Sequence, residues 1–345
     1  MAGNAGGGDG MSTMRDIARL ANVSVATVSR VINNDTTYRM RQETQDRVWK
    51  AIAETGYRVP PPRLDTSRES ARKNLQVGCV LSIVKEKYRD PFFMSVLSGI
   101  ETRLTERGYA LGFLRTQTEL RDRAVLRDAL ESSPAGLILM DTLEPPLYRA
   151  LRAKIPICVG VDTLHEDIDT VGYDHFATAR RAVETLVSRG HEAIAFIGGS
   201  PAGEFAYNGR YMGYRYAMHA AGLPAPAAWI HNCAWDELTC MAQVREMMSR
   251  PGRPTAIFAA SDLMAIAALS ALYSMGISVP GQAAVIGISN IELSKFSSPP
   301  LTTYEVPAYE IGRLAADLIH DRLNDNFPLP RRIQLPTRLV LRESV

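Results

Sequence analysis

The sequence predicts a protein of two parts: an all-α helix-turn-helix module, then an α/β domain of two lobes, each built on a parallel, doubly wound sheet. Three observations support this. The chain has 345 residues, more than one ordinary domain holds. Residues 12–56 carry apolar side chains at helical spacing. Beyond residue 76, short apolar runs alternate with amphipathic helical stretches, which is the pattern of βαβ units.

Composition excludes several classes of protein. Hydrophobic residues make up 46% of the chain and charged residues 22%, as in ordinary globular proteins. No apolar run approaches the ~20 residues that span a bilayer, and the N-terminus lacks the features of a signal peptide. We therefore expect a cytoplasmic protein that does not bind a membrane. The four cysteines form no CxxC pair, so we predict no disulfide framework, no metal and no cofactor.

Charge is distributed unevenly along the chain. Residues 1–76 hold twelve Lys or Arg against eight Asp or Glu, whereas residues 77–345 hold 27 against 29. A basic front on a mildly acidic body fits a nucleic-acid-binding module carried by a domain of another role.

Local composition marks the boundaries. The first residues are Gly-rich and predict a disordered tail. Gly56 is a stop signal for the last helix of the first module. Pro60, Pro61 and Pro62 then remove three consecutive amide donors, which predicts a linker. We divide the chain into tail, helical module, linker and large domain at residues 1–11, 12–58, 59–76 and 77–345.

The stretch TMRDIARLANVSVATVSRVIN is the most informative in the sequence. Ser12 or Thr13 can cap a first helix, and Ser24 can cap a second that packs through Val28 and Val31. Two short helices at a fixed angle place the second in the major groove of DNA. The alternative is a three-helix bundle in which the Ser and Thr side chains only cap and solvate.

The motifs VSVATVSRVIN and ETQDRVWKAIAETGY resemble the DNA-binding headpiece of the lactose/galactose-repressor (LacI/GalR) family. The resemblance implies that Val25, Ala26 and Arg30 contact base edges, where a guanine contact by Arg30 would contribute ~1–3 kcal/mol of discrimination. Arg41 stands where the family usually has serine, and either contacts a phosphate or is solvated. Residues implied to contact the DNA backbone are Thr13, Ser24, Thr27, Ser29, Asn33, Thr44 and Tyr57.

The linker departs from the family pattern. Members commonly carry a hinge helix whose leucine wedges into the minor groove of the operator. Here Thr66 and Glu69 can form a capping box for a helix that ends near Leu75. Either Leu75 or Leu64 is then the candidate wedge.

The larger domain resembles the periplasmic-binding-protein-like core of the same family, for example in VGYDHFATARRAVETLVSRGHEAIAFIGG and NGRYMGYRYAM. The resemblance implies two lobes and three chain crossings, expected near His175, Leu301 and Pro330. The N-lobe then comprises residues 77–174 and 302–330, and the C-lobe residues 175–301 and 331–345.

Ligands of open parallel sheets lie outside the carboxyl ends of the strands, which selects candidate binding residues. Asp90, Phe92 and Phe93 follow the first strand, and the two rings either stack on a sugar or pack as the start of a core helix. Asp162 follows the third apolar run and suits sugar hydroxyls.

Arg210 supplies a fork of donors, and Trp235 follows a later strand, where its ring can stack on a ligand. The family resemblance assigns effector contact to Asp162, Arg210 and Trp235.

Two further positions follow late strands. Asp262 begins a helix after Ser261, and helix capping is favoured for both. The family often has Gly-Tyr/Phe-Asp-Asp after the sixth run, where this chain has Gly-Ile and then Ser289 and Asn290. These two are candidate effector residues, and the missing carboxylate favours a neutral or differently oriented ligand.

The resemblance implies a homodimer on a pseudo-palindromic operator that represses carbohydrate-utilisation genes until a mono- or disaccharide releases it. The segments SARKNLQ and DPFF resemble the subgroup that contains the evolved β-galactosidase repressor, which implies a β-galactoside. No HExxH, GxSxG or Walker motif supports an enzyme. The attached headpiece argues against an exported sugar receptor.

Overall fold

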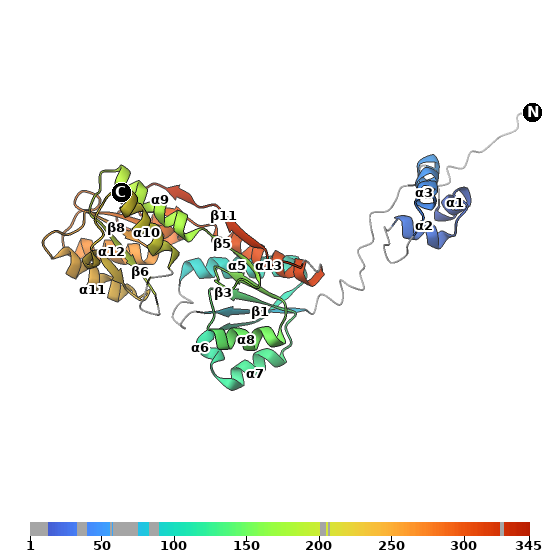
Figure 1. Cartoon of the computed structure of the whole chain (residues 1–345), viewed down its shortest axis with the longest axis horizontal. Helices are drawn as coiled ribbons and strands as arrows, with labels where there is room; N and C mark the ends of the chain where they lie inside the picture. The colour runs from blue at the N-terminus through green and yellow to red at the C-terminus, as the bar shows by residue number, and fades with distance from the viewer. Residues whose placement is uncertain are drawn as a thin grey trace, which may run out of the picture. The chain divides into compact units, whose positions relative to one another are not determined.

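The computed structural model of the chain describes residues 13–32, 40–55, 57, 75–82, 90–200, 205, 208–324 and 328–345. Contacts divide the chain into two compact units, residues 1–71 and 72–345 (Figure 1). The predicted tail and most of the predicted linker lie outside the described residues.

The described residues of the first unit form the helices α1 (Met14–Leu20), α2 (Val25–Ile32) and α3 (Gln42–Thr55). Each contributes one fully buried aliphatic side chain to a shared core, Ile17, Val28 and Val48. The backbone N and the hydroxyl of Thr13 both donate to Asp16 Oδ2, at 2.9 and 2.7 Å, which closes the start of α1. The predicted stop at Gly56 lies outside the described residues.

The second unit contains two six-stranded sheets. Its strands are β1 (Gln76–Leu81), β2 (Ala110–Thr116), β3 (Gly136–Met140), β4 (Cys158–Val161), β5 (Asp169–Tyr173), β6 (Ile194–Gly198), β7 (Ile230–Asn232), β8 (Ala256–Ala259), β9 (Ala284–Ser289), β10 (Thr302–Glu305), β11 (Arg332–Leu335) and β12 (Arg338–Val340). The first sheet has the order β11-β5-β4-β3-β1-β2 and the second β12-β10-β9-β8-β6-β7. The pairs are parallel except β10 with β12.

Helices cover both faces of each sheet. They are α5 (Pro91–Glu106), α6 (Gln117–Leu120), α7 (Arg123–Glu131), α8 (Pro145–Lys154), α9 (His175–Ser188), α10 (Gly209–Ala220), α11 (Glu237–Met248), α12 (Asp262–Ser274) and α13 (Ala308–Asn324), with the 3₁₀ turns η2 (Ala227–Trp229) and η3 (Glu292–Lys295). On the first sheet, α5 and α13 cover one face and α6, α7 and α8 the other; on the second, α9 and α10 lie opposite α11 and α12 (Figure 1). Sheets covered on both faces need strands buried on both sides, and β3 and β8 are apolar throughout.

The chain crosses between the sheets three times. The first crossing follows Tyr173, as predicted near His175. The second comes after β10, which pairs with β9, and the third comes after β11, which pairs with β5. The crossings predicted near Leu301 and Pro330 were therefore wrong. They assigned β10 to the N-lobe and β11 to the C-lobe, whereas each strand belongs to the other lobe.

The physical reason is that β10 and β11 carry no apolar run. The sequence of β10 is TTYE, and β11 is half exposed at the sheet edge. We define lobe 1 as residues 75–173 and 308–335, and lobe 2 as residues 175–305 and 338–345. No helix among the described residues has the length and apolarity needed to cross a membrane.

Candidate functional site

Five side chains meet where strands of the two lobes end, and we name them the Tyr173 cluster. Two of them belong to lobe 1: Asp162 follows β4, and Tyr173 ends β5. The other three belong to lobe 2: His175 begins α9, Arg210 lies in the first turn of α10, and Trp235 follows β7. The strand-end rule and the family resemblance predicted Asp162, Arg210 and Trp235, and the structure connects all three through Tyr173 and His175.

Tyr173 and Arg210 join the two lobes. Nε and Nη2 of Arg210 donate to the Tyr173 hydroxyl oxygen at 3.0 and 2.7 Å. Burial raises the pKa of Tyr173 to about 12, although the Arg210 charge acts in the opposite direction, so the hydroxyl keeps its proton at neutral pH. Because both lone pairs of the oxygen accept from Arg210, the hydroxyl proton is left to donate, and the described residues offer it no acceptor.

Asp162 and His175 form a second contact between the lobes. Nε2 of His175 lies 3.1 Å from Oδ1 of Asp162, and the side chains are 29% and 14% exposed. The backbone N of Tyr173 donates to the same oxygen at 3.4 Å. Oδ2 of Asp162 has no partner among the described residues, so the carboxylate keeps an acceptor for a ligand.

Sequence reasoning missed Tyr173 and His175. Tyr173 sits at the carboxyl end of a buried strand, so the strand-end rule contained the signal for it. His175 carries no such signal, because it does not end a strand of its own. Its ring stacks on Tyr173 with centroids 4.1 Å apart, because the first crossing brings the start of α9 against the end of β5.

Trp235 lies beside Arg210, with the guanidinium carbon 5.5 Å from the ring centroid. The ring also lies against Gly199, where a Cβ would come within 2.4 Å of it. On the other side of the cluster, a Cβ at Gly172 would lie 2.0 Å from Oδ1 of Asp162. Glycine at these two positions therefore gives both functional side chains their space.

Four of the eight predicted effector residues have left-handed backbone conformations: Asp162 (φ 51°), Trp235 (63°), Ser289 (129°) and Asn290 (55°). For non-glycine residues such conformations cost roughly 1–3 kcal/mol each and persist only where surrounding contacts hold them. Strain of this kind concentrates at ligand-binding sites, which favours the strand ends as the functional region.

Ser289 and Asn290 end β9 in lobe 2. Oδ1 of Asn290 accepts from Arg342 Nη2 at 2.6 Å and from Ser294 Oγ at 3.4 Å. This oxygen is therefore already bonded within lobe 2. No contact within the described part of the chain joins Ser289 or Asn290 directly to the Tyr173 cluster.

Asp90, Phe92 and Phe93 have structural roles at the start of α5. Oδ1 of Asp90 accepts from the backbone N of Phe92 at 2.9 Å and caps the helix. Phe92 is 9% exposed and belongs to the core, whereas Phe93 is half-buried and meets it edge to face. For Phe92 the structure agrees with the core-packing alternative.

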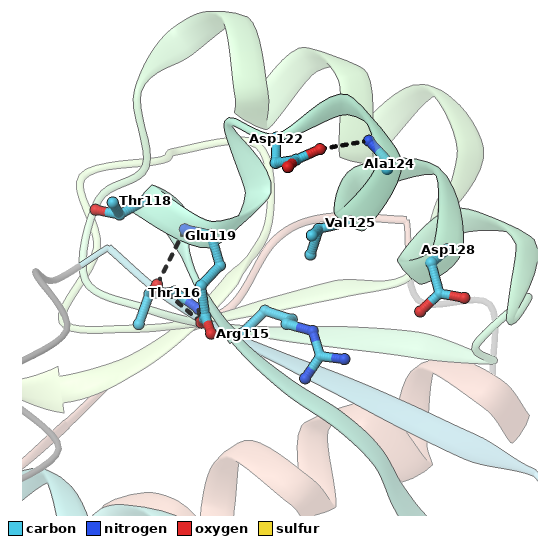
Figure 2. Close-up of a pocket in the computed structure, with 8 residues that line it drawn as sticks. All are labelled: Arg115, Thr116, Thr118, Glu119, Asp122, Ala124, Val125 and Asp128. Carbon is cyan, nitrogen blue, oxygen red and sulfur yellow. Dashed lines mark hydrogen bonds between the residues drawn. The ribbon is translucent and has the colours of Figure 1, made fainter.

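A separate hollow of about 650 Å³ lies in lobe 1, beside the end of β2, α6 and α7. Figure 2 shows that two of its acidic side chains serve helix ends: Glu119 accepts from Thr116, and Asp122 accepts from the backbone N of Ala124. The hollow contains none of the predicted site residues. Its lining is Arg115, Thr116, Thr118, Glu119, Asp122, Ala124, Val125 and Asp128.

The second helix of the headpiece, α2, has the predicted amphipathic arrangement. Val28 and Val31 are buried, whereas Val25 is 43% exposed and Ala26 and Arg30 are also exposed. The residues implied to meet base edges therefore face solvent on one helix.

The polar residues implied to contact the DNA backbone have local partners. Ser24 Oγ accepts from Thr27 N at 3.1 Å and lies 2.8 Å from Thr27 Oγ1. The Arg41 carbonyl accepts from Thr44 N at the start of α3, and Arg41 itself is exposed. Ser29, Thr44 and Tyr57 are half-buried, Tyr57 packs against the helical core, and Asn33 lies outside the described residues.

Leu75 directly precedes β1, and the other residues of the predicted linker helix lie outside the described residues. Leu75 packs against the core of lobe 1, and its carbonyl accepts from Ala110 N at 3.1 Å. The side chain is partly buried beside β1, and its role as a minor-groove wedge stays a prediction. Leu64 lies outside the described residues.

Comparisons with known proteins agree with this architecture. The family descriptions "Bacterial regulatory proteins, lacI family" and "Periplasmic binding protein-like domain" match residues 13–59 and 183–345. The ribose operon repressor of Escherichia coli strain K12 is 32% identical over 97% of this chain and 100% of its own length. The HTH-type transcriptional repressor PurR of Aliivibrio salmonicida is 30% identical over 97% and 99%.

Solved structures give the same result. The transcriptional regulator CelR in complex with cellobiose is 29% identical, covers 97% of this chain and 100% of its own, and has a TM-score of 0.71. The lac repressor dimer bound to operator is 24% identical over 96% and 98%, with a TM-score of 0.69, and shows the shared fold. The chain therefore belongs to the lacI family of bacterial regulatory proteins.

Proposed function

We propose that this chain is a sequence-specific transcriptional repressor of carbohydrate-utilisation genes, which acts in the cytoplasm and leaves its operator when a mono- or disaccharide binds. The exposed face of α2 supports the DNA-binding part, since Val25, Ala26 and Arg30 are exposed on it while Val28 and Val31 pack into the headpiece core. One headpiece reads few base pairs, so a homodimer on a pseudo-palindromic operator supplies the affinity.

The Tyr173 cluster carries the sugar-binding part. A sugar ring presents hydroxyl groups around its edge and apolar faces above and below. The cluster offers the Tyr173 hydroxyl and Arg210 as donors, Oδ2 of Asp162 as an acceptor and the Trp235 ring as a stacking face. The relatives named as a ribose operon repressor and a cellobiose complex support a saccharide.

Ligand binding at this cluster would act on both lobes. Asp162 and Tyr173 belong to lobe 1, whereas His175, Arg210 and Trp235 belong to lobe 2. A ligand held by both sets of side chains favours one angle between the lobes over another. We propose that this angle sets the spacing of the two headpieces in the dimer, which makes DNA affinity depend on the sugar.

The test is footprinting on the DNA upstream of the gene, with and without D-ribose, cellobiose or lactose. We expect protection of a pseudo-palindromic site and its loss with one of the sugars. Lactose tests the β-galactoside predicted from the subgroup resemblance. Stronger protection with a sugar would mean corepression in place of induction. Absence of specific protection would refute the DNA-binding part, and thermal stabilisation by a purine or nucleoside but by none of the sugars would refute the saccharide.

A further inference from the structure

Asp262 is a buried carboxylate in lobe 2 whose role is not helix capping. It is 1% exposed and is the first residue of α12. The N-cap is Ser261, whose Oγ accepts from Met264 N at 3.4 Å. The capping role that the sequence favoured for both residues therefore belongs to Ser261 alone, and the Asp262 carboxylate is directed elsewhere.

Both carboxylate oxygens of Asp262 bond to the segment that follows β9 and to β10. Oδ2 accepts from the backbone N of Ile291 at 3.0 Å, and Oδ1 accepts from Thr303 Oγ1 at 2.6 Å. A Cβ at Gly287 would lie 2.3 Å from Oδ1, so the glycine makes room for the carboxylate against β9. Asp262 thus connects the start of α12 with the turn at residues 289–291.

That turn has a conformation that L-residues rarely adopt. Ser289 has φ 129° and Asn290 has φ 55°. The backbone amides of the turn donate to two side chains: Ile291 N to Asp262 at 3.0 Å, and Asn290 N to Thr303 Oγ1 at 3.4 Å. Arg342 and Ser294 donate to the Asn290 side chain, and the carbonyls of Ser289 and Ile291 accept from neighbouring residues. Because Thr303 also donates to Asp262, the carboxylate takes part directly or indirectly in both bonds that the amides of Asn290 and Ile291 make.

We propose that Asp262 is a positioning residue, which together with Thr303 holds the turn of residues 289–291 in its left-handed form and so orients Ser289 and Asn290 for the effector. These two residues occupy the place where the family often has its effector-binding carboxylate. The link to the effector rests on the proposed function, whereas the hold on the turn does not.

The charge of Asp262 makes this hold depend on pH. Burial raises the pKa of Asp262 to about 7, although the bonds from Thr303 and Ile291 and the charge of Arg342 act in the opposite direction. Lobe 1 contributes Tyr173, whose pKa the Asp262 charge helps to raise. Ionised Asp262 accepts from both donors. Once protonated, it needs the Thr303 hydroxyl as an acceptor, so the turn loses part of its support as the pH falls through about 7.

Amide hydrogen exchange on the ligand-free full chain tests the positioning role. Exchange at residues 290 and 291 is measured about one unit below and above the pKa of Asp262, corrected for the intrinsic rate. We expect Asp262→Ala to speed this exchange about tenfold, the value of one lost buried hydrogen bond. Asp262→Asn keeps an acceptor for Ile291 and a partner for Thr303, so it should retain protection and lose its pH dependence.

Ser261→Ala is the matched control, because it weakens the same end of α12 and leaves the Asp262 contacts in place. Unchanged exchange in Asp262→Ala, an equal effect of Ser261→Ala, or pH dependence that persists in Asp262→Asn would each overturn the positioning role. Thr303→Val, which removes the hydroxyl with little change of shape, repeats the test should Asp262→Ala not fold. We expect it to speed exchange at residue 290.

Calorimetry with D-ribose, cellobiose and lactose tests the link to the effector. For a sugar that binds the unmodified protein, Asp262→Ala should weaken binding about tenfold or more, with no change in operator affinity without sugar. Equal sugar affinity in both proteins would overturn the link. If none of the three sugars binds the unmodified protein, the proposed function is what fails, since the exchange result stands without a ligand.

Discussion

Nε2 of His175 lies 3.1 Å from Oδ1 of Asp162, so a side chain of lobe 2 holds a candidate effector-binding residue of lobe 1. The His175 ring also stacks on Tyr173, the residue that anchors Arg210. His175 therefore orients both the acceptor and the donors that the Tyr173 cluster presents.

Replacing His175 by Ala should weaken effector binding. A hydrogen bond of this kind contributes about 0.5–1.5 kcal/mol, which corresponds to a loss of roughly 2- to 10-fold in affinity. His175→Asn retains a donor and should recover part of the loss. Titration of the protein with its releasing sugar measures both. An affinity equal to that of the unmodified protein in His175→Ala would show that Asp162 needs no orientation by His175.

Arg210→Lys should weaken the response to sugar by roughly one to two orders of magnitude in sugar concentration and leave operator binding intact. Lys has no planar fork, so it cannot place two donors on the Tyr173 hydroxyl as Nε and Nη2 do. Loss of one charged hydrogen bond costs about 1.5–3 kcal/mol. Anisotropy of labelled operator, with and without sugar, measures both properties. Arg215→Lys, on the exposed side of the same helix, is the control and should respond to sugar normally.

Much of this architecture follows from local sequence patterns. Continuous apolar runs predict the buried strands because a parallel sheet covered on both faces excludes water from both. Asp162 follows such a run, and Trp235 follows the short, half-buried strand β7, so the strand-end rule finds both. His175 does not follow a strand directly but begins α9, and its role depends on where the first crossing between the lobes places the start of that helix.

The roles of Leu75 and Asp262 depend on packing between distant segments. Leu75 is partly buried against the core of lobe 1, and Asp262 bonds to residues 29 and 41 positions away. No local sequence pattern predicts contacts between residues so far apart in the chain. The same holds for β10 and β11, whose polar or half-exposed sequences do not mark the lobe to which they belong.

Arg30→Ala should weaken operator binding and relax its sequence preference at one base pair. An arginine bonded to guanine contributes ~1–3 kcal/mol of discrimination, so the preference should fall by roughly one to two orders of magnitude. Competition binding with operators changed at single positions measures this. Arg19→Ala is the control, since Arg19 lies on α1, where its side chain is 85% exposed. Equal effects of the two changes would mean that Arg30 acts only through its charge.

Asp169→Asn should destabilise the protein at neutral pH and less so in acid. Asp169 is buried and accepts from Arg322 Nε at 2.8 Å and Arg331 Nη2 at 2.9 Å. Burial raises the pKa of Asp169, but these bonds more than offset it, so the net pKa is lowered. The resulting stability is present above the unfolded pKa of about 3.9 and is lost as the pH falls through the folded value.

Removing the charge weakens the bonds that Arg322 and Arg331 donate to this side chain, whereas Arg331 keeps its bond to Asp321, so the loss should be about 1.5–3 kcal/mol, the value of a hydrogen bond to a charged group. Urea unfolding at neutral pH and about one pH unit below the unfolded pKa measures the effect, and the difference between the two proteins should shrink in acid. A difference that stays constant with pH would show that the charge of Asp169 contributes no stability.

Gly99→Ala and Gly312→Ala should each destabilise lobe 1, although Ala is favoured over Gly in a helix. A Cβ at Gly99 of α5 would lie 2.0 Å from the Tyr309 carbonyl oxygen of α13, and one at Gly312 would lie 2.0 Å from the Val96 carbonyl oxygen. A backbone carbonyl within a helix cannot rotate away from the added methyl group as a side chain could, so α5 and α13 must move apart.

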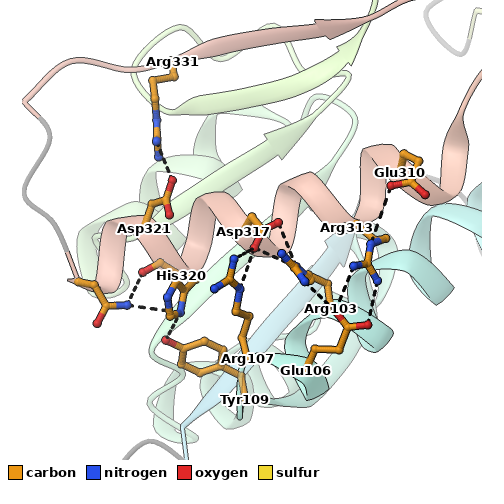
Figure 3. A network of polar contacts seen from close by, with 11 residues as sticks. Arg103, Glu106, Arg107, Tyr109, Glu310, Arg313, Asp317, His320, Asp321 and Arg331 are labelled. Carbon is orange, nitrogen blue, oxygen red and sulfur yellow. Dashed lines mark hydrogen bonds and ion pairs between the residues drawn. The ribbon is translucent and has the colours of Figure 1, made fainter. Parts of the chain in front are cut away.

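Separation of α5 and α13 also strains the polar network in Figure 3, in which Asp317 accepts from Arg103 and Arg107 at 2.7–3.0 Å. Overpacking costs roughly 1–3 kcal/mol, which exceeds the 0.5–1 kcal/mol that Ala gains over Gly in a helix. Ser98→Ala, on the exposed side of α5, should change the free energy of unfolding by no more than about 0.5 kcal/mol. Urea unfolding of the three variants decides the sign, because a net gain in either glycine variant would mean that the helices can move apart without loss.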